Sequence, residues 1–311
     1  MEILNLFIFT PFGEMADSPV FLAEVIIGGL LSGIMYSLVA LGFVLIYKAS
    51  GVFNFAQGAM VLFAALTLVG LMERAMPMPL AIIATMAIMV GLAFIIEKWL
   101  LRPLVNQEQI ILFMATIGLN LVFEGGGQIA WGSNVKKLDI GVPDTSFEAG
   151  GILFNTFDLF AAGIAAVLVA FLIVFFQKTA MGRALRAVAD DHQAALSVGI
   201  PLKTIWVVVW SVAGFVALVA GIVWGAKAGV QFSLALIALK ALPVLILGGF
   251  ESIPGAIVGG LVIGVIEKVS EVYWGPAFGG AIEGWIAYMM ALAFLLLRPQ
   301  GIFGDKIIER V

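Results

Sequence analysis

The chain has 311 residues, of which 62% are hydrophobic and 12% are charged, against roughly 45–50% and about 25% in soluble domains. A soluble core of this composition would leave a large apolar surface in water, so an ordinary soluble fold is excluded. Without cysteine the chain has no disulfide and no Cys-ligated metal, and its single histidine, His192, cannot form a multi-histidine metal site. We expect no metal and no other cofactor.

Apolar stretches recur along the chain, each close to the roughly 20 residues that a helix needs to cross a bilayer. Residues 1–17 lack the features of a signal peptide, and we expect them in the mature protein. The sequence predicts an all-α, polytopic transmembrane bundle of about eight to nine spans, forming one domain over residues 1–311. The expected spans are 20–47, 52–72, 78–97, 108–131, 157–177, 204–224, 234–249, 254–270 and 282–298. The second span is interrupted by polar residues and the seventh and eighth are joined by a very short link, so broken or re-entrant helices are expected there.

The distribution of lysine and arginine predicts the orientation, because cytoplasmic loops carry more of them. Placing the N-terminus outside puts most basic residues at the cytoplasmic ends of the spans, including the C-terminus and the loop 178–203. The cytoplasmic set is Lys48, Lys98, Arg102, Lys178, Arg183, Arg186, Lys203, Arg298, Lys306 and Arg310, and the external set is Arg74, Lys136, Lys137, Lys227 and Lys268. Lys240 falls within a span, where it either pairs with a carboxylate or extends to the interface.

Polar residues in the second span indicate a broken helix. Asn54 and Gln57 lie between Gly51 and Gly58, and broken helices expose backbone groups that can hold a polar solute. The alternative is hydrogen bonding between helices, worth under about 2 kcal/mol, which only packs the bundle.

The fourth span carries Thr116, Asn120, Glu124 and Gln128 at every fourth residue, on one helical stripe. An ionisable residue at membrane depth costs about 2.5–3.5 kcal/mol on insertion scales, so it normally faces a cavity or a partner. Together with Asn54 and Gln57, this stripe is the expected substrate pathway. The alternative is that Glu124 lies near the outer end of the span and reaches headgroup water.

The polar segment 178–203 is rich in helix-forming residues and ends at Gly199 and Pro201, which predicts a cytoplasmic helix. Arg186 and Asp190 stand four residues apart on it. Its alanines leave a surface of small side chains onto which another protein could close. A solvated connector between two spans is the alternative.

Four segments resemble the branched-chain amino-acid type of ABC importer permeases, and of its two permease types the LivH-like one is the more similar. Gly182-Arg-Ala-Leu-Arg-Ala-Val-Ala-Asp190, with Ala194 to Ile200 after it, resembles the family's coupling segment. The other three are Asn54-Phe-Ala-Gln-Gly58, Gly248-Gly-Phe-Glu-Ser-Ile-Pro-Gly-Ala-Ile-Val-Gly-Gly260 and Leu297-Arg-Pro-Gln-Gly-Ile-Phe-Gly304. The matches run from residue 54 to 304. Gln57 stands where many members have histidine, so no ionisable role is carried over to it.

The resemblance implies a permease subunit, not an enzyme, in the bacterial cytoplasmic (inner) membrane. Its partners would be a second, LivM-like permease, two cytoplasmic ATPase subunits and an extracytoplasmic solute-binding protein, with no nucleic acid. Branched-chain or related amino acids are the expected solutes, and urea, short amides and other carboxylates are the alternatives. The residues expected to contact the ATPases are Arg183, Arg186, Asp190, Asp191, Ala194 and Gly199. The chain has no Gly-x-x-x-x-Gly-Lys-Ser/Thr phosphate loop, so ATP must be hydrolysed elsewhere.

In the eighth span Ser252 is a candidate N-cap, and the glycine pairs Gly255/Gly259 and Gly260/Gly264 predict tight helix contact, including a contact with the second permease. Two other functions fit the residues alone. An ion-coupled secondary transporter of a small polar solute would use Glu124 and the broken helices but needs no coupling segment. A structural membrane subunit of a larger enzyme should lack a polar stripe.

Overall fold

A computed structural model describes residue 7 and residues 9–104, 107–190 and 192–304. Most of this part is helical. The elements are α2 (Thr10–Asp17), α3 (Pro19–Ser50), α4 (Gln57–Glu73), α5 (Met78–Ile96), a π-helical turn (Glu97–Leu101), α6 (Arg102–Leu104), α7 (Gln109–Trp131), β1 (Ser146–Ala149), β2 (Ile152–Asn155), α8 (Thr156–Lys178), α9 (Ala180–Asp190), α10 (His192–Ser197), α11 (Leu202–Ala228), a 3-10 helix (Phe232–Leu236), α12 (Ile237–Gly248), α13 (Ile253–Tyr273), α14 (Gly275–Phe278) and α15 (Glu283–Leu297). The antiparallel hairpin of β1 and β2 corrects the all-α expectation, because four residues on each side pair across a Gly150-Gly151 turn.

An apolar helix stands at each of the nine expected spans. Within the described part, six helices are long and apolar enough to cross a membrane: Pro19–Ser50, Met78–Leu104, Gln109–Trp131, Thr156–Lys178, Leu202–Ala228 and Ile253–Tyr273. Three apolar helices are shorter, at Gln57–Glu73, Phe232–Gly248 and Glu283–Leu297. The count of eight to nine crossings therefore stays a prediction. The eighth span, expected as a candidate re-entrant helix, is one of the long helices, whereas the ninth is one of the short ones.

Local signals explain where several helices begin and end. α3 stops at Gly51, whose φ of +67° favours glycine, and its N–H caps the carbonyl of Tyr47. Ser252 Oγ accepts the N–H of Gly255 at 3.0 Å, which confirms it as the N-cap of α13. Asn155 caps α8 in the same way, through the N–H of Asp158.

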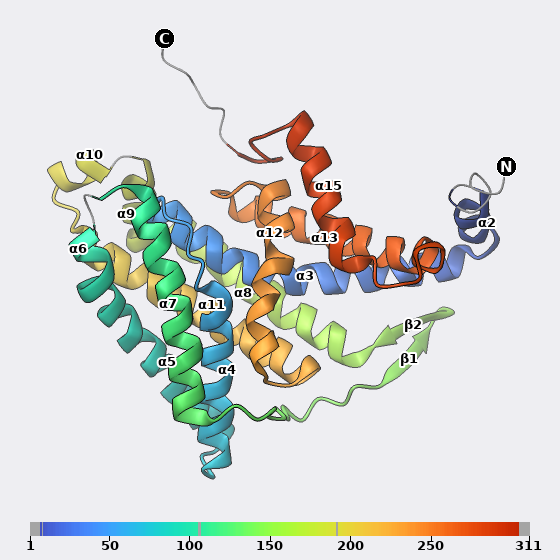
Figure 1. The fold of residues 1–311 in the computed structure, drawn as a ribbon, viewed down its shortest axis with the longest axis horizontal. Helices are drawn as coiled ribbons and strands as arrows, with labels where there is room; N and C mark the ends of the chain where they lie inside the picture. Colours follow the sequence, from blue (N-terminus) through green and yellow to red (C-terminus); the bar gives the residue numbers. More distant parts are fainter. Residues whose placement is uncertain (1–6, 8, 105–106, 191, 305–311) are drawn as a thin grey trace.

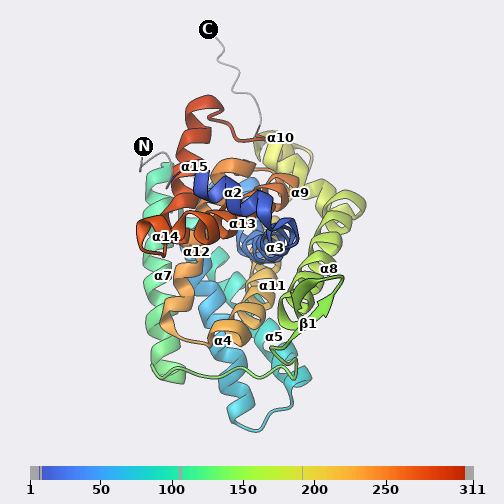
Figure 2. The ribbon, with the colours of Figure 1, turned by 90° about the vertical axis from the view of Figure 1, so that its right-hand side faces the viewer.

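Helices α3 and α13 lie side by side at the centre of the molecule, as Figures 1 and 2 show. Glycines on both helices let the backbones touch. A Cβ placed on Gly33 would lie 2.4 Å from the carbonyl oxygen of Gly260, and one on Gly264 would lie 2.3 Å from that of Gly29. Gly255 meets Gly248 of α12 in the same way. These glycines thus pack against helices of the same chain, and not against a second permease.

The helices α4, α5 and α7 stand next to one another and run across the direction of α3 (Figures 1 and 2). The C-terminal ends of α4 and α7 lie at the bottom of Figure 1, while α6, α9 and α10 lie at its upper left. This separation is the one that the predicted orientation requires, with the loop 178–203 on the opposite side from the loops after α4 and α7.

Candidate solute cleft and coupling surface

The connection between α3 and α4 is held by one side chain of α7. Thr116 is 1% exposed, and its Oγ1 accepts the N–H of Phe55 at 3.0 Å. The hydroxyl lies 3.2 Å from the carbonyl oxygen of Phe53 and 2.8 Å from that of Phe113, so it donates to one of these acceptors. Thr116 therefore satisfies the N–H of Phe55, directly after Asn54, and lies within hydrogen-bond distance of the Phe53 carbonyl before it, at the break that the polar residues predicted.

Asn54 and Gln57 are completely buried inside this break. Asn54 Oδ1 accepts the N–H of Ala56 at 3.2 Å, and its Nδ2 lies 3.4 Å from Gln57 Oε1. Gln57 lies against Gly42 of α3, where a Cβ would come within 2.0 Å of Nε2. In the described part of the chain Gln57 Nε2 has no hydrogen-bond partner. The pair shapes the break from within and does not line the cleft beside it.

That cleft has a volume of about 200 Å3 and lies among α3, the break, α7 and α12. Its wall is aromatic and aliphatic except at two positions, Asn120 and Glu124. The lining residues are Phe43, Phe53, Phe55, Asn120, Glu124, Ala235, Leu236, Ala238, Leu239 and Leu242. The structure thus brings the middle of the predicted polar stripe to a cavity, while Thr116 is buried behind it and Gln128 is exposed farther along α7.

Rings close one end of the cleft. Phe53 stacks on Phe43 with ring centroids 4.9 Å apart, and it also contacts Phe55, Phe113 and Phe250. Sequence analysis missed these phenylalanines, because aromatic residues in a membrane bundle mostly pack helices or anchor them at the interface. Their position beside the polar Asn54-Phe-Ala-Gln57 element was the available signal.

The opposite wall of the cleft is α12, which Pro243 interrupts. Proline has no N–H, so the carbonyl of Leu239 loses its helical donor. The hydroxyl of Tyr288, on α15, donates to this carbonyl at 2.6 Å. A side chain 49 residues away thereby restores the hydrogen bond that the proline removed, next to the point where Leu239 lines the cleft.

Lys240 forms ion pairs with two carboxylates. Its Nζ lies 3.4 Å from both carboxylate oxygens of Glu267, which is 3% exposed, and 3.7 Å from Glu283 Oε1. It also lies 5.8 Å from the ring centre of Tyr36. The network joins α12 to α13 and to the start of α15. Of the two possibilities that the sequence left open for Lys240, the structure shows pairing.

The predicted coupling segment forms α9 and α10. The N–H of Gly182 bonds Thr179 Oγ1 at 2.9 Å, and a Cβ on Gly182 would meet the carbonyl oxygen of Phe176 at 2.3 Å, so α9 begins tightly against the end of α8. Leu185 and Val188 are buried on one face of α9, whereas the side chain of Arg183 is exposed.

The other residues that were predicted to contact the ATPases have different surroundings. Arg186 donates to the carbonyl of Phe176 and is half-buried. Ala194 and Gly199 are exposed, and Gly199 has a φ of +85° where the segment ends. The backbone of Asp190 closes α9, but its side chain, like the whole of Asp191, lies outside what the structure describes. The pairing of Arg186 with Asp190 therefore stays a prediction.

A hollow of about 260 Å3 lies beside α9, between Arg186 and the loop that precedes α13. It contains Lys48, whose Nζ donates to the carbonyl of Glu251 at 3.2 Å, and the exposed Glu251 itself. This loop belongs to the Gly248–Gly260 motif. Glu251 was not among the predicted site residues, because its position beside Arg186 depends on contacts between segments that are far apart in the sequence.

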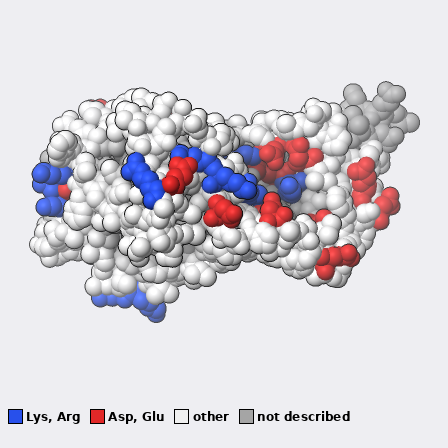
Figure 3. Space-filling view, turned by 90° about the horizontal axis from the view of Figure 1, so that it is seen from below, with Lys and Arg blue, Asp and Glu red and all other residues white. Residues whose placement is uncertain are grey.

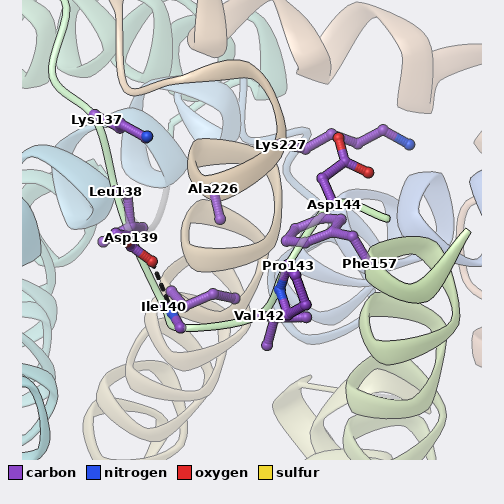
Figure 4. Close-up of a pocket in the computed structure, with 11 residues that line it drawn as sticks. Lys137, Leu138, Asp139, Ile140, Val142, Pro143, Asp144, Phe157, Ala226 and Lys227 are labelled. Atoms are coloured by element: carbon purple, nitrogen blue, oxygen red, sulfur yellow. Dashed lines mark hydrogen bonds between the residues drawn. The ribbon is translucent and has the colours of Figure 1, made fainter. Parts of the chain in front are cut away.

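Charged side chains of both signs gather in a band on the opposite side, which Figure 3 views from below. Here Lys227 pairs with Asp158 at 2.5 Å, and Lys136 pairs with Glu73. The strap Lys137–Asp144 borders a hollow of about 440 Å3 with Phe157, Ala226 and Lys227 (Figure 4). Its volume is larger than that of the cleft beside Glu124, but none of the predicted pathway residues lines it.

Comparisons with known proteins decide between the transport classes. The family model described as "Branched-chain amino acid transport system / permease component" matches residues 25–298. The chain belongs to this family. It is 26% identical to the high-affinity branched-chain amino acid permease protein LivH of Salmonella typhimurium, covering 96% of this chain and all of the relative. It is 28% identical to BraD of Pseudomonas aeruginosa over 92% of this chain and 97% of the relative. It is also 26% identical to the fructose import permease protein FruG of Bifidobacterium longum, over 83% and 78%.

This family membership confirms the resemblance of the four motifs. A branched-chain amino acid type ABC permease is an importer subunit of the inner membrane and not an enzyme, since ATP is hydrolysed in separate ATPase subunits. Permeases of this family act together with ATPase and solute-binding partners. The ion-coupled transporter and the structural enzyme subunit are thereby set aside.

Proposed function

We propose that residues 1–311 act as one permease domain that imports branched-chain or related amino acids, and that a second, LivM-like permease completes its translocation pathway. The LivH and BraD relatives, which align along nearly their whole length, support this choice of solute. FruG shows that relatives of similar identity carry sugars, so the solute has to be argued from the cleft.

The observation that carries the proposal is the exposure of α7 beside the cleft. Only 22% of the apolar 18-residue stretch of α7 is buried, against 78% for α3. Ile110, Met114, Leu121 and Val122 are each more than half exposed. A helix with lipid on one side could show this pattern, but α7 also places Asn120 and Glu124 at a cleft, where lipid contact would be costly. A second permease covering this side would turn the open cleft into a pathway.

The coupling surface supports the ATPase partnership. α9 and α10 project from the bundle at the side where α6 also ends (Figure 1), and Leu196 and Val198 are 50% and 75% exposed next to Ala194. Apolar residues exposed on a short helix outside the bundle are suited to burial against another protein. On the opposite side, the charged band of Figure 3 is the surface that we assign to the solute-binding protein.

Co-purification tests the assembly. Expressed with the permease, ATPase and binding-protein genes of its own operon or genome, the tagged chain should retain an ATPase and a second permease. Asp190→Lys combined with Ala194→Trp should abolish solute-stimulated ATP hydrolysis while the chain stays folded in the membrane, because a bulky, charge-reversed face cannot dock. Ala149→Trp, in the exposed strand β1, is the matched control and should keep full stimulation. Undiminished stimulation in the double variant would contradict the coupling assignment.

A further inference from the structure

The carboxylate of Glu124 has an amide partner but no cation. Its Oε1 accepts from Asn120 Nδ2 at 3.0 Å, one helical turn earlier on α7. Within the described part of the chain, no lysine, arginine or histidine nitrogen lies within 4 Å of it. By contrast, Glu267, the other glutamate deep in the bundle near the cleft, has Lys240. An ionised carboxylate that leaves bulk water is costly unless it is paired, so Glu124 lacks the counter-charge that Glu267 has.

Among the described residues that line the cleft, Asn120 is the one polar side chain besides Glu124. Phe43, Phe53 and Phe55 line one part of it, and Leu236, Leu239 and Leu242 line the part that faces them from α12 and the preceding turn. Leu236 and Leu239 are 60% and 42% exposed. A solute that fits this arrangement has an apolar side chain for the phenyl and leucyl wall and one positive group for Glu124.

We propose that Glu124 is the counter-ion for a protonated amino group on the solute, with Asn120 as the residue that orients its carboxylate. The inference rests on the proposed function and narrows its substrate class to amines with an apolar side chain, zwitterionic amino acids among them. A positive group is attracted both to the carboxylate and to the faces of the neighbouring phenyl rings. Neutral sugars, amides and carboxylic acids without an amino group leave Glu124 unpaired, and the cleft selects against them.

A single cysteine in this cysteine-free chain makes the cleft measurable. Leu236→Cys is alkylated with N-ethylmaleimide, in the full chain in detergent and in the assembled transporter without ATP. The probes are L-leucine, 3-methylbutylamine, which lacks its carboxylate, and 4-methylpentanoate, which lacks its amino group. Leucine and the amine should protect the cysteine, and at roughly ten times its Kd a ligand slows labelling about tenfold. The acid should not protect it. Glu124→Gln should remove the protection, and Glu124→Asp should keep part of it.

Two control variants distinguish the loss of a binding partner for the amino group from a structural effect of the Glu124→Gln substitution. Ser133→Cys, on the exposed strap after α7, should be alkylated at the same rate with every probe. Adding Gln128→Glu to Glu124→Gln returns a carboxylate one turn away, outside the cleft, and should not restore protection. Equal protection by the amine and the acid, protection that survives Glu124→Gln, or no protection in either preparation overturns the proposal. Leucine uptake by the assembled wild type is measured separately, because its absence would refute the proposed function while leaving amine binding testable.

Discussion

Helices α13 and α7 carry similar residues in very different surroundings. Each is long enough to cross the membrane, and each contains closely spaced glycines and a glutamate. On α13, Gly264 touches the backbone of α3, and Glu267 is paired with Lys240. On α7, no described residue of another element lies within 4 Å of the Cβ position of Gly125 or Gly126, and the hydrogen-bond partner of Glu124 in the described ranges is the amide of Asn120.

The difference distinguishes a helix whose polar and small residues are satisfied by contacts within the chain from a helix whose residues are not. The small residues and the charge of α13 are satisfied within the chain, so this helix belongs to the scaffold. Gly125, Gly126 and Glu124 of α7 have no such contacts among the described residues, and the groups that would satisfy them must come from a solute, a partner subunit or the lipid. Glycine spacing and an intramembrane glutamate do not separate these two situations in the sequence, because both helices have them.

The largest expected effect tests the scaffold side. Gly264→Leu on α13 forces a side chain into a space where even a Cβ would lie 2.3 Å from Gly29 O and 2.5 Å from Gly33 Cα. Overpacking a core typically costs about 1–3 kcal/mol, and a backbone contact that cannot yield exceeds this range. We expect the variant to lose nearly all monodisperse protein in size-exclusion chromatography. Gly125→Leu on α7 should behave like the wild type, and equal losses in the two variants would break the comparison.

The second effect concerns the paired glutamate. Lys240→Met leaves Glu267 buried without its cation, and breaking a buried ion pair costs about 3–5 kcal/mol, toward the lower figure here because Lys240 is a quarter exposed. The thermal midpoint in detergent should fall clearly. Combining Lys240→Met with Glu267→Gln removes the unpaired charge and should recover most of the loss. A double variant as unstable as the single one would mean that Lys240 contributes packing and not charge.

The sequence was sufficient for much of the fold, because apolar length and polar interruptions are local properties. The nine apolar helices, the N-cap Ser252, the break at Asn54 and the helical coupling segment were all predictable. The hairpin of β1 and β2 was not predicted, since its strands have only four residues each and the alternation in Ser146–Ala149 does not continue in Ile152–Asn155. α15 follows the predicted span 282–298 to within one residue at each end, and its 15 residues are fewer than the roughly 20 that a crossing helix needs.

The candidate site was predictable only in part, because burial depends on contacts between distant segments. The stripe on α7 was visible at a four-residue spacing, but its members separate in the structure: Thr116 is buried, Asn120 and Glu124 line the cleft, and Gln128 is exposed. The pairings of Lys240 with Glu267 and of Tyr288 with Leu239 join residues 27 and 49 positions apart. Pro243 indicates in the sequence that the carbonyl of Leu239 lacks its helical hydrogen-bond donor, but it does not identify Tyr288 as the side chain that replaces this donor.

A smaller effect tests how α7 holds the break. Thr116→Val keeps the shape of the side chain but removes the acceptor of the Phe55 N–H, and an unsatisfied buried group costs about 1–3 kcal/mol. We expect a lower thermal midpoint and reduced solute-stimulated ATP hydrolysis, because Phe53 and Phe55 line the cleft. Thr116→Ser retains the hydroxyl and should retain both properties. If serine behaves like valine, the methyl group and not the hydrogen bond holds the break.

The smallest effect tests the opposite wall of the cleft. Tyr288→Phe removes the only side-chain donor to the Leu239 carbonyl in the described part of the chain and leaves the ring in place. The net value of such a hydrogen bond is about 0.5–1.5 kcal/mol, and the site is partly exposed, so the thermal midpoint should fall only slightly. Pro243→Ala restores the helical N–H that Leu239 lacks, and in this background Tyr288→Phe should have no further effect. The two substitutions are therefore expected to be non-additive in a double-mutant cycle of unfolding midpoints. Additive effects would show that Tyr288 stabilises α15 alone, and that α12 holds its position beside Glu124 without it.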